Sequence, residues 1–145
     1  MRHRRPTERS SRGSVLMLMP AAIVIVLLLG AITVDSAIVY LEQRQAYNVA
    51  LDAANDVAGA GLDRDRARTT GELVYDPGRV HELAAAAIDA SEVEGLTLVS
   101  ARPDGDGVAV TVEVQVQRLF SQAFGGRSSE TLQLTARATG EVRVP

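Results

Sequence analysis

Few side chains in this sequence could do chemistry. The chain has no Cys and two His, one in the N-terminal tail and one, His81, in a predicted short helix. Nucleophilic catalysis needs a nucleophile beside a base, and neither a nucleophile elbow nor a phosphate-binding loop occurs in the sequence. We interpret His81 as a surface residue and expect no catalysis, although acids on different strands could still converge in space.

One acidic motif invites a metal hypothesis. Residues 104–107 read Asp-Gly-Asp-Gly, which is similar to the start of a calcium-binding loop. Such a loop needs about five or six ligand positions and an acidic residue that closes it, and the following residues do not supply them. Asp-Gly pairs between apolar runs are typical of hairpin turns. We therefore predict a turn here and expect neither a metal nor a cofactor.

The composition narrows the class of protein. The chain of 145 residues carries 15 basic side chains, all of them Arg, and has a formal net charge of −3. A slightly acidic chain without Cys resembles neither a nucleic-acid binder nor a disulfide-stapled secreted module. We expect no nucleic-acid partner and no small-molecule substrate.

The element around which the rest of the sequence is arranged is a long apolar run. Residues 15–34 carry no charge, and as a helix they would reach about 30 Å, the thickness of a bilayer's hydrocarbon core. We predict a transmembrane helix over residues 15–41 that contacts membrane lipid. A cleavable signal peptide is the alternative, but the run is too long and small residues at its cleavage positions are poorly offered. The basic residues of the tail, residues 1–14, predict a cytoplasmic N-terminus with the rest of the chain outside; they are Arg2, Arg4, Arg5, Arg9 and Arg12.

Two residues within this run have structural interpretations of their own. Pro20 lies six residues into it, where a missing N–H and a steric clash predict a kink, or a proline that the membrane helix tolerates. Asp35 follows the uncharged residues, and we interpret it as a membrane-boundary acid, either an interface marker or a local helix partner.

The helix is expected to continue outside the membrane to about residue 61. Small apolar residues recur there at spacings of four and three, which places them on one face of a helix. That face either contacts a neighbouring helix, as a partner interface, or supports the chain's own sheet. Its members are Ala46, Ala50, Ala53, Val57 and Ala60.

Residues 62–145 are predicted to form a small extracytoplasmic α+β domain. Residues 63–70 read as a solvated connector, and residues 79–92 as a short helix. From residue 96 the apolar period changes to two, which predicts a three-stranded antiparallel sheet with strands over residues 96–101, 108–116 and 130–144. The clearest strand alternates five Val residues, whose face the two helices must cover: Val108, Val110, Val112, Val114 and Val116.

The order of motifs in the first 60 or so residues resembles TadE/TadG-like Flp pilus-assembly proteins. The matching pieces are Arg12-Gly13-Ser14-Val15, the apolar run with its early Pro20, Val34-Asp35-Ser36, Tyr40-Leu41 and the stretch Leu51-Asp52-Ala53-Ala54-Asn55-Asp56-Val57-Ala58-Gly59-Ala60. The resemblance implies a pilin-like fold and pilin-like or pilus-assembly membrane proteins as partners. Processed relatives carry Glu at the fifth position after a cleaved Gly. Here the fifth position after Gly13 is Leu18, which favours an unprocessed assembly factor.

Three functions are therefore compared. The first is a single-pass, non-catalytic component of Flp-type pilus assembly or a related secretion apparatus, acting through helix packing and surface contacts. The second is a membrane-tethered sensor or binding module with a ligand outside the cell. The third, a secreted enzyme, predicts release from the membrane and a hydrolytic activity.

Overall fold

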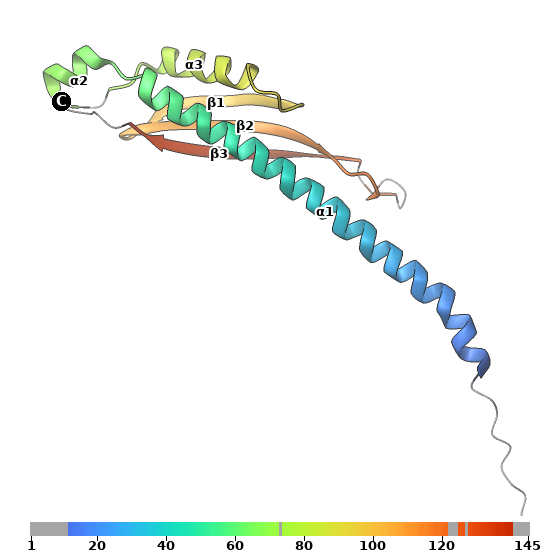
Figure 1. The fold of residues 1–145 in the computed structure, drawn as a ribbon. Helices are drawn as coiled ribbons and strands as arrows, with labels where there is room; N and C mark the ends of the chain where they lie inside the picture. Colours follow the sequence, from blue (N-terminus) through green and yellow to red (C-terminus); the bar gives the residue numbers. More distant parts are fainter. Residues whose placement is uncertain (1–11, 73, 122–124, 127, 141–145) are drawn as a thin grey trace, which may run out of the picture.

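The structure is a computed structural model that describes residues 12–72, 74–121, 125–126 and 128–140. Three helices precede three strands along the chain (Figure 1). Their bounds are α1 Arg12–Ala60, α2 Arg64–Thr70, α3 Pro77–Asp89, β1 Leu96–Asp104, β2 Gly107–Gln117 and β3 Ser129–Thr139. The predicted α+β class, the long N-terminal helix, the short helix and the three-stranded antiparallel sheet are confirmed.

Helix α1 is a single element of 49 residues, about 74 Å long. It runs through Pro20 without interruption and is drawn as one gently curved helix (Figure 1). It ends where the Gly61 N–H donates to the Val57 carbonyl oxygen at 2.7 Å. A side chain at Gly61 would meet that same carbonyl, so a residue without one suits this close turn.

The domain has two layers, a sheet of order β1-β2-β3 and the helices α1 and α3 on one of its faces. The alternating Val residues of β2 are buried, as the period of two predicts. Helix α3 contributes Val80, Ala84 and Ile88 to the core, and the second half of α1 lies across β2 and β3. The first half of α1 extends beyond the sheet (Figure 1).

The opposite face of the sheet is polar. Thr111 and Thr135 share a hydrogen bond of 2.9 Å across β2 and β3, and the Gln133 amide donates to Glu113 at 3.0 Å. Arg137 pairs with Asp104 at 2.7 Å. Cross-strand polar pairs of this kind are typical of an antiparallel sheet with one face in water.

The structure corrects the prediction for residues 63–70. Residues 64–70 form the short helix α2 instead of a connector, because Asp63 accepts from the Arg66 N–H at its start and Gly71 ends it in the left-handed conformation, φ 73°. Polar composition concealed these two capping signals.

The strand boundaries also differ in detail. Strand β1 continues to Asp104, with a bulge between Leu98 and Ser100, and β3 ends at Thr139. The predicted continuation of the last strand over residues 141–144 lies outside the described residues. The predicted hairpin turn is confirmed, since β1 ends at Asp104 and β2 begins at Gly107.

The core joins both sides of the expected boundary at residue 62. Ala50, Ala54 and Ala58 of α1 lie in the same cluster as Val110 and Val112 of the sheet. Helix α3 and the sheet therefore share their hydrophobic core with the end of α1.

Candidate functional site at the helix–sheet junction

Asp35 marks the point at which α1 first meets the domain. It is 5% exposed, and among the described residues it is the one charged residue that is buried. A buried carboxylate is costly unless hydrogen-bond donors replace the water it loses. The hydrogen-bond partners of Asp35 therefore show which part of the domain α1 contacts here.

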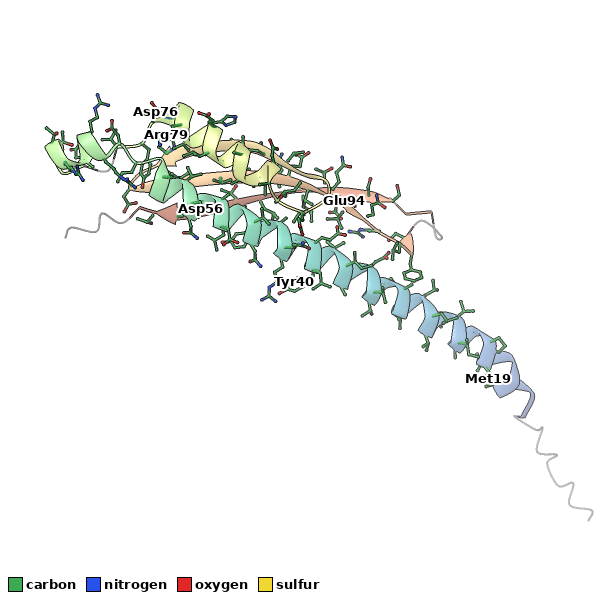
Figure 2. The ribbon with its side chains drawn as sticks, turned by 45° about the horizontal axis from the view of Figure 1, so that its top comes forward. Met19, Tyr40, Asp56, Asp76, Arg79 and Glu94 are labelled. Atoms are coloured by element: carbon green, nitrogen blue, oxygen red, sulfur yellow. The ribbon has the colours of Figure 1, made fainter. Side chains whose placement is uncertain are left out.

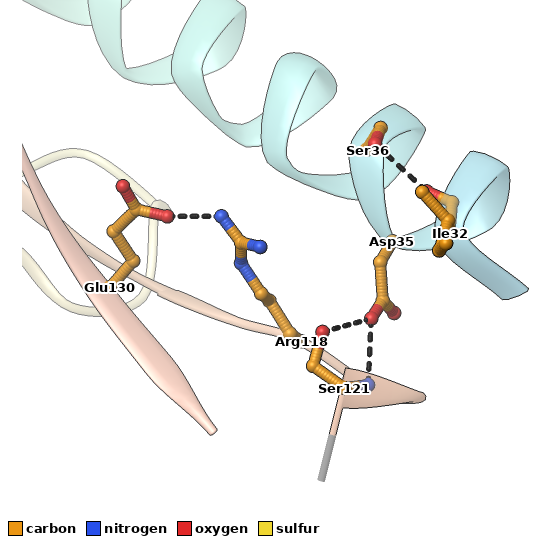
Figure 3. Close-up of polar contacts among 6 residues, drawn as sticks. All are labelled: Ile32, Asp35, Ser36, Arg118, Ser121 and Glu130. Carbon is orange, nitrogen blue, oxygen red and sulfur yellow. Dashed lines mark hydrogen bonds and ion pairs between the residues drawn. The ribbon is translucent and has the colours of Figure 1, made fainter. Parts of the chain in front are cut away.

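Four donors surround the carboxylate, all from the turn that follows β2. The N–H groups of Leu119 and Phe120 donate to Oδ1, each at 3.0 Å. The Ser121 N–H donates to Oδ2 at 2.8 Å, and the Ser121 hydroxyl to the same oxygen at 2.6 Å (Figure 3). Successive N–H groups that converge in this way form an anion-binding concavity. We call Leu119, Phe120 and Ser121 the junction turn.

The strands on either side hold the junction turn in place. The Arg118 N–H donates to the Ser128 carbonyl oxygen at 3.0 Å, which continues the β2–β3 ladder beyond the last strand pair. The Arg118 side chain forms an ion pair with Glu130 at the start of β3 (Figure 3). The turn is thus tied to the sheet on one side and to α1 on the other. Asp35 has no partner on its own helix in the hydrogen bonds described for it, so of its two interpretations the local helix partner does not match the geometry.

The segment of α1 before Asp35 has no protein against it. Most of its aliphatic side chains over residues 18–34 are exposed, for example Leu27 at 66% and Leu29 at 60%, and Leu28 is half-buried. By length and composition this one helix could cross a membrane, and it is not the buried core helix of a soluble domain, because almost none of its most apolar part is covered. We call residues 18–34 the apolar segment.

The segment of α1 after Asp35 shows where the stripe of small residues lies. Ala46, Ala50, Ala53 and Val57 are buried at 0%, 0%, 2% and 1% exposure, against the sheet and α3. Ala60, the fifth member, is exposed. Of the two interpretations of the stripe, the structure shows the packing on the chain's own sheet. We call residues 46–58 the packed segment.

An open cleft of about 850 Å³ lies beside the junction. It runs between α1 and the link from α3 to β1, and its acidic lining residues are Glu42, Glu92 and Glu94. The described residues include no group of three His, Cys, Asp or Glu side chains arranged to hold a metal ion. His81 lies exposed on α3.

Sequence reasoning missed the junction turn. Residues 119–129 read as a connection between strands, and no local signal pairs them with an acid more than 80 residues earlier. The sequence contained only part of the signal. An acid at the end of an uncharged run needs hydrogen-bond donors, and no basic residue stands next to Asp35 in the sequence.

Comparison with known proteins does not assign this chain to a family. No family model, no curated protein and no solved structure matches it.

Proposed function

We propose that this protein is a membrane-anchored, non-catalytic component of Flp-type pilus assembly or a related secretion apparatus. The observation that carries the proposal is the division of one continuous helix into a free apolar segment and a segment packed on a small antiparallel sheet. Together with the TadE/TadG-like order of motifs in its first 60 or so residues, this layout supports a pilin-like subunit that acts by contact.

The proposed topology follows from charge. The apolar segment spans the cell membrane once, the Arg-rich tail stays in the cytoplasm, and the sheet lies outside. Residues 1–11 of the tail lie outside the described residues, so the support for this orientation is the sequence. With Leu18 at the fifth position after Gly13, the protein acts as an unprocessed assembly factor.

The partner contact uses the face of α1 that the sheet leaves free. Figure 2 shows Tyr40 on the side of α1 away from the sheet, and its side chain is 62% exposed. Leu41 is 62% and Tyr47 is 42% exposed on the same stretch of helix. Exposed apolar side chains just above a membrane span are suited to packing against the helices of pilin-like or pilus-assembly proteins.

The experiment uses the absence of native Cys. Asn48→Cys places a thiol on the exposed face of α1, and Ala53→Cys places one on the buried face of the same helix. Each variant is expressed in its own host and crosslinked, and the membrane-fraction adducts are identified by mass spectrometry together with the intact N-terminus. We expect adducts of Asn48→Cys with pilin-like or assembly-platform proteins, and none of Ala53→Cys.

Deletion of the gene gives the complementary test. Loss of surface pili or of their associated secretion, restored by the wild-type gene, is the expected result. Unchanged pili and secretion, or adducts of Asn48→Cys with unrelated proteins only, would overturn the proposal.

The acidic cleft favours a second candidate function, a membrane-tethered module that binds a cationic ligand outside the cell. Glu42 comes from α1, and Glu92 and Glu94 come from the link before β1, so charge from two parts of the chain faces one space. Spermidine serves as a probe. This candidate predicts that it raises the unfolding temperature of the full chain, and that Glu42→Gln with Glu94→Gln removes the increase.

A further inference from the structure

The junction turn exposes two large apolar side chains. Leu119 is 64% exposed and Phe120 is 43% exposed, although the backbone N–H groups of both residues are held by Asp35. Exposed apolar side chains on a turn fixed by a buried carboxylate differ from those scattered singly over a surface. Their position relative to the apolar segment suggests what covers them.

The junction turn lies level with the outer end of the apolar segment. Asp35 directly follows the last uncharged residue of that segment, Val34, and hydrogen bonds of 2.6–3.0 Å hold the turn to it. Figure 1 shows the end of the sheet at the β2–β3 link on the side of the domain nearest the free half of α1. A bilayer that covers the apolar segment therefore has its outer boundary at the height of this turn.

Several polar groups at this level are satisfied within the protein. Thr33 and Ser36 donate their hydroxyls to carbonyl oxygens one turn earlier in α1, each at 2.8 Å. Asp35 accepts from all three N–H groups of the junction turn. Irregular backbone enters a membrane at high cost when its N–H groups lack partners, and here they have them.

We propose that Leu119 and Phe120 insert into the outer interface of the bilayer beside α1. The protein then contacts lipid at two places, the transmembrane helix and the junction turn, and Asp35 is the positioning residue that joins them. This inference rests on the membrane anchoring in the proposed function, but not on any role in pilus assembly. The occupant of the exposed surface is a lipid interface, where aromatic side chains are favoured.

The absence of native Trp allows a direct measurement of depth. Three full-length variants each carry one tryptophan: Phe120→Trp in the junction turn, Ile25→Trp in the apolar segment and Val99→Trp on β1. Ile25 is 56% exposed and Val99 is 46% exposed. Val99 lies seven or so residues along the strands from the turn, roughly 24 Å. Each variant is reconstituted in vesicles whose lipids carry bromine near the headgroup or deep in the acyl chain.

Quenching by the two lipids separates the outcomes. We expect the tryptophan of Ile25→Trp to be quenched most by deep bromine, that of Phe120→Trp by shallow bromine, and that of Val99→Trp by neither. Adding Asp35→Ala to Phe120→Trp should reduce its shallow quenching and make its emission more accessible to aqueous iodide. A role of Asp35 in stability alone would leave the depth of Phe120→Trp unchanged in the folded fraction.

Other results would overturn the inference. A Phe120→Trp emission open to iodide and insensitive to both lipids would show a turn in water. Protection from iodide without lipid quenching would show a second protein on this surface. If Ile25→Trp is also insensitive to deep bromine, the anchor itself fails, and that failure is distinguishable from the failure of the turn alone.

Discussion

The two segments of α1 share a helix and differ in what surrounds them. The apolar segment carries large aliphatic side chains that no protein covers, such as Leu27 and Leu29. The packed segment carries Ala on the face that meets the sheet, with Ala46, Ala50 and Ala54 all fully buried. Both segments carry apolar side chains, but only those of the packed segment are buried in the protein.

The difference shows how side-chain size reports the neighbour. Small side chains let the axis of a helix come close to a sheet, and the Val side chains of β2 fill the space between them. Large side chains on all sides have no such partner here and suit a fluid lipid surface. Three substitutions and one change of pH test this comparison, from the largest expected effect to the smallest.

Leu27→Arg should have the largest effect, because it places a charge near the centre of the apolar segment. Insertion of Arg at the middle of a membrane helix costs about 2.5–3.5 kcal/mol. We expect the fraction of protein that resists alkaline extraction from membranes to fall. Asn48→Arg, at an exposed site within the packed segment, is the control and should leave that fraction unchanged. Equal extraction of both variants would contradict the membrane assignment of the apolar segment.

Ala50→Leu tests the packed segment. Ala50 is fully buried in the core, so the added atoms force α1 away from the sheet at a cost of about 1–3 kcal/mol. Ala60→Leu is the matched control on the same stripe, where an exposed side chain should change the free energy of unfolding by less than about 0.5 kcal/mol. Urea denaturation in detergent micelles, followed by circular dichroism, measures both. A similar loss for the two variants would mean that this face is not a core.

Asp35→Ala breaks the link between the two segments and the sheet. Without the carboxylate, the three N–H groups of the junction turn lose their acceptor, so their hydrogen exchange should become faster. The amides of β2 next to the packed segment, such as that of Val112, should keep their protection. Asp35→Asn retains one acceptor oxygen, so the exchange rate of its junction turn should lie between those of the wild-type protein and Asp35→Ala. Unchanged exchange at the turn would argue against the contact.

The smallest effect is expected from a change of pH, which should act through Tyr75 in the hydrophobic core. Burial raises the pKa of Tyr75 above its ordinary value of 10.0, and its hydroxyl donates to the Asp106 carbonyl oxygen at 3.3 Å. Because the folded protein holds this proton more tightly than the unfolded chain does, the contribution to stability is complete below pH about 10 and is lost as the pH rises through the folded pKa.

The control for this pH effect is Tyr75→Phe. When the pH is raised from neutral to above about 10, the free energy of unfolding measured with urea should fall more for the wild-type protein than for the variant. The other two tyrosines, Tyr40 and Tyr47, are exposed and are present in both proteins. An identical loss in both would show that Tyr75 does not cause it.

Much of the fold could be predicted because it rests on local periodicity. Alternating Val residues gave strand β2 and its buried face, and the Asp-Gly pairs gave the hairpin before it. Helix α2 was missed because its residues are polar on all sides, and only its caps, Asp63 and Gly71, distinguish it from a loop. Patterns of apolar residues identify elements with a buried face, and α2 presents little of one.

The junction could be predicted only in part. The position of Asp35 at the end of an uncharged run was evident, but its partners are 84 to 86 residues away in sequence. Backbone N–H groups occur in every residue except Pro, so residue types do not show which of them will bind a carboxylate. The stripe of small residues predicted a close contact, and the tertiary arrangement decided that the contact is with the chain's own sheet.

The continuity of α1 has a mechanical consequence. Between residues 31 and 58 the sequence has neither Gly nor Pro, so no hinge separates the apolar segment from the domain, and Asp35 fastens the sheet to the helix at the boundary. Any displacement of this helix by one residue along its axis would therefore carry the whole domain with it by about 1.5 Å.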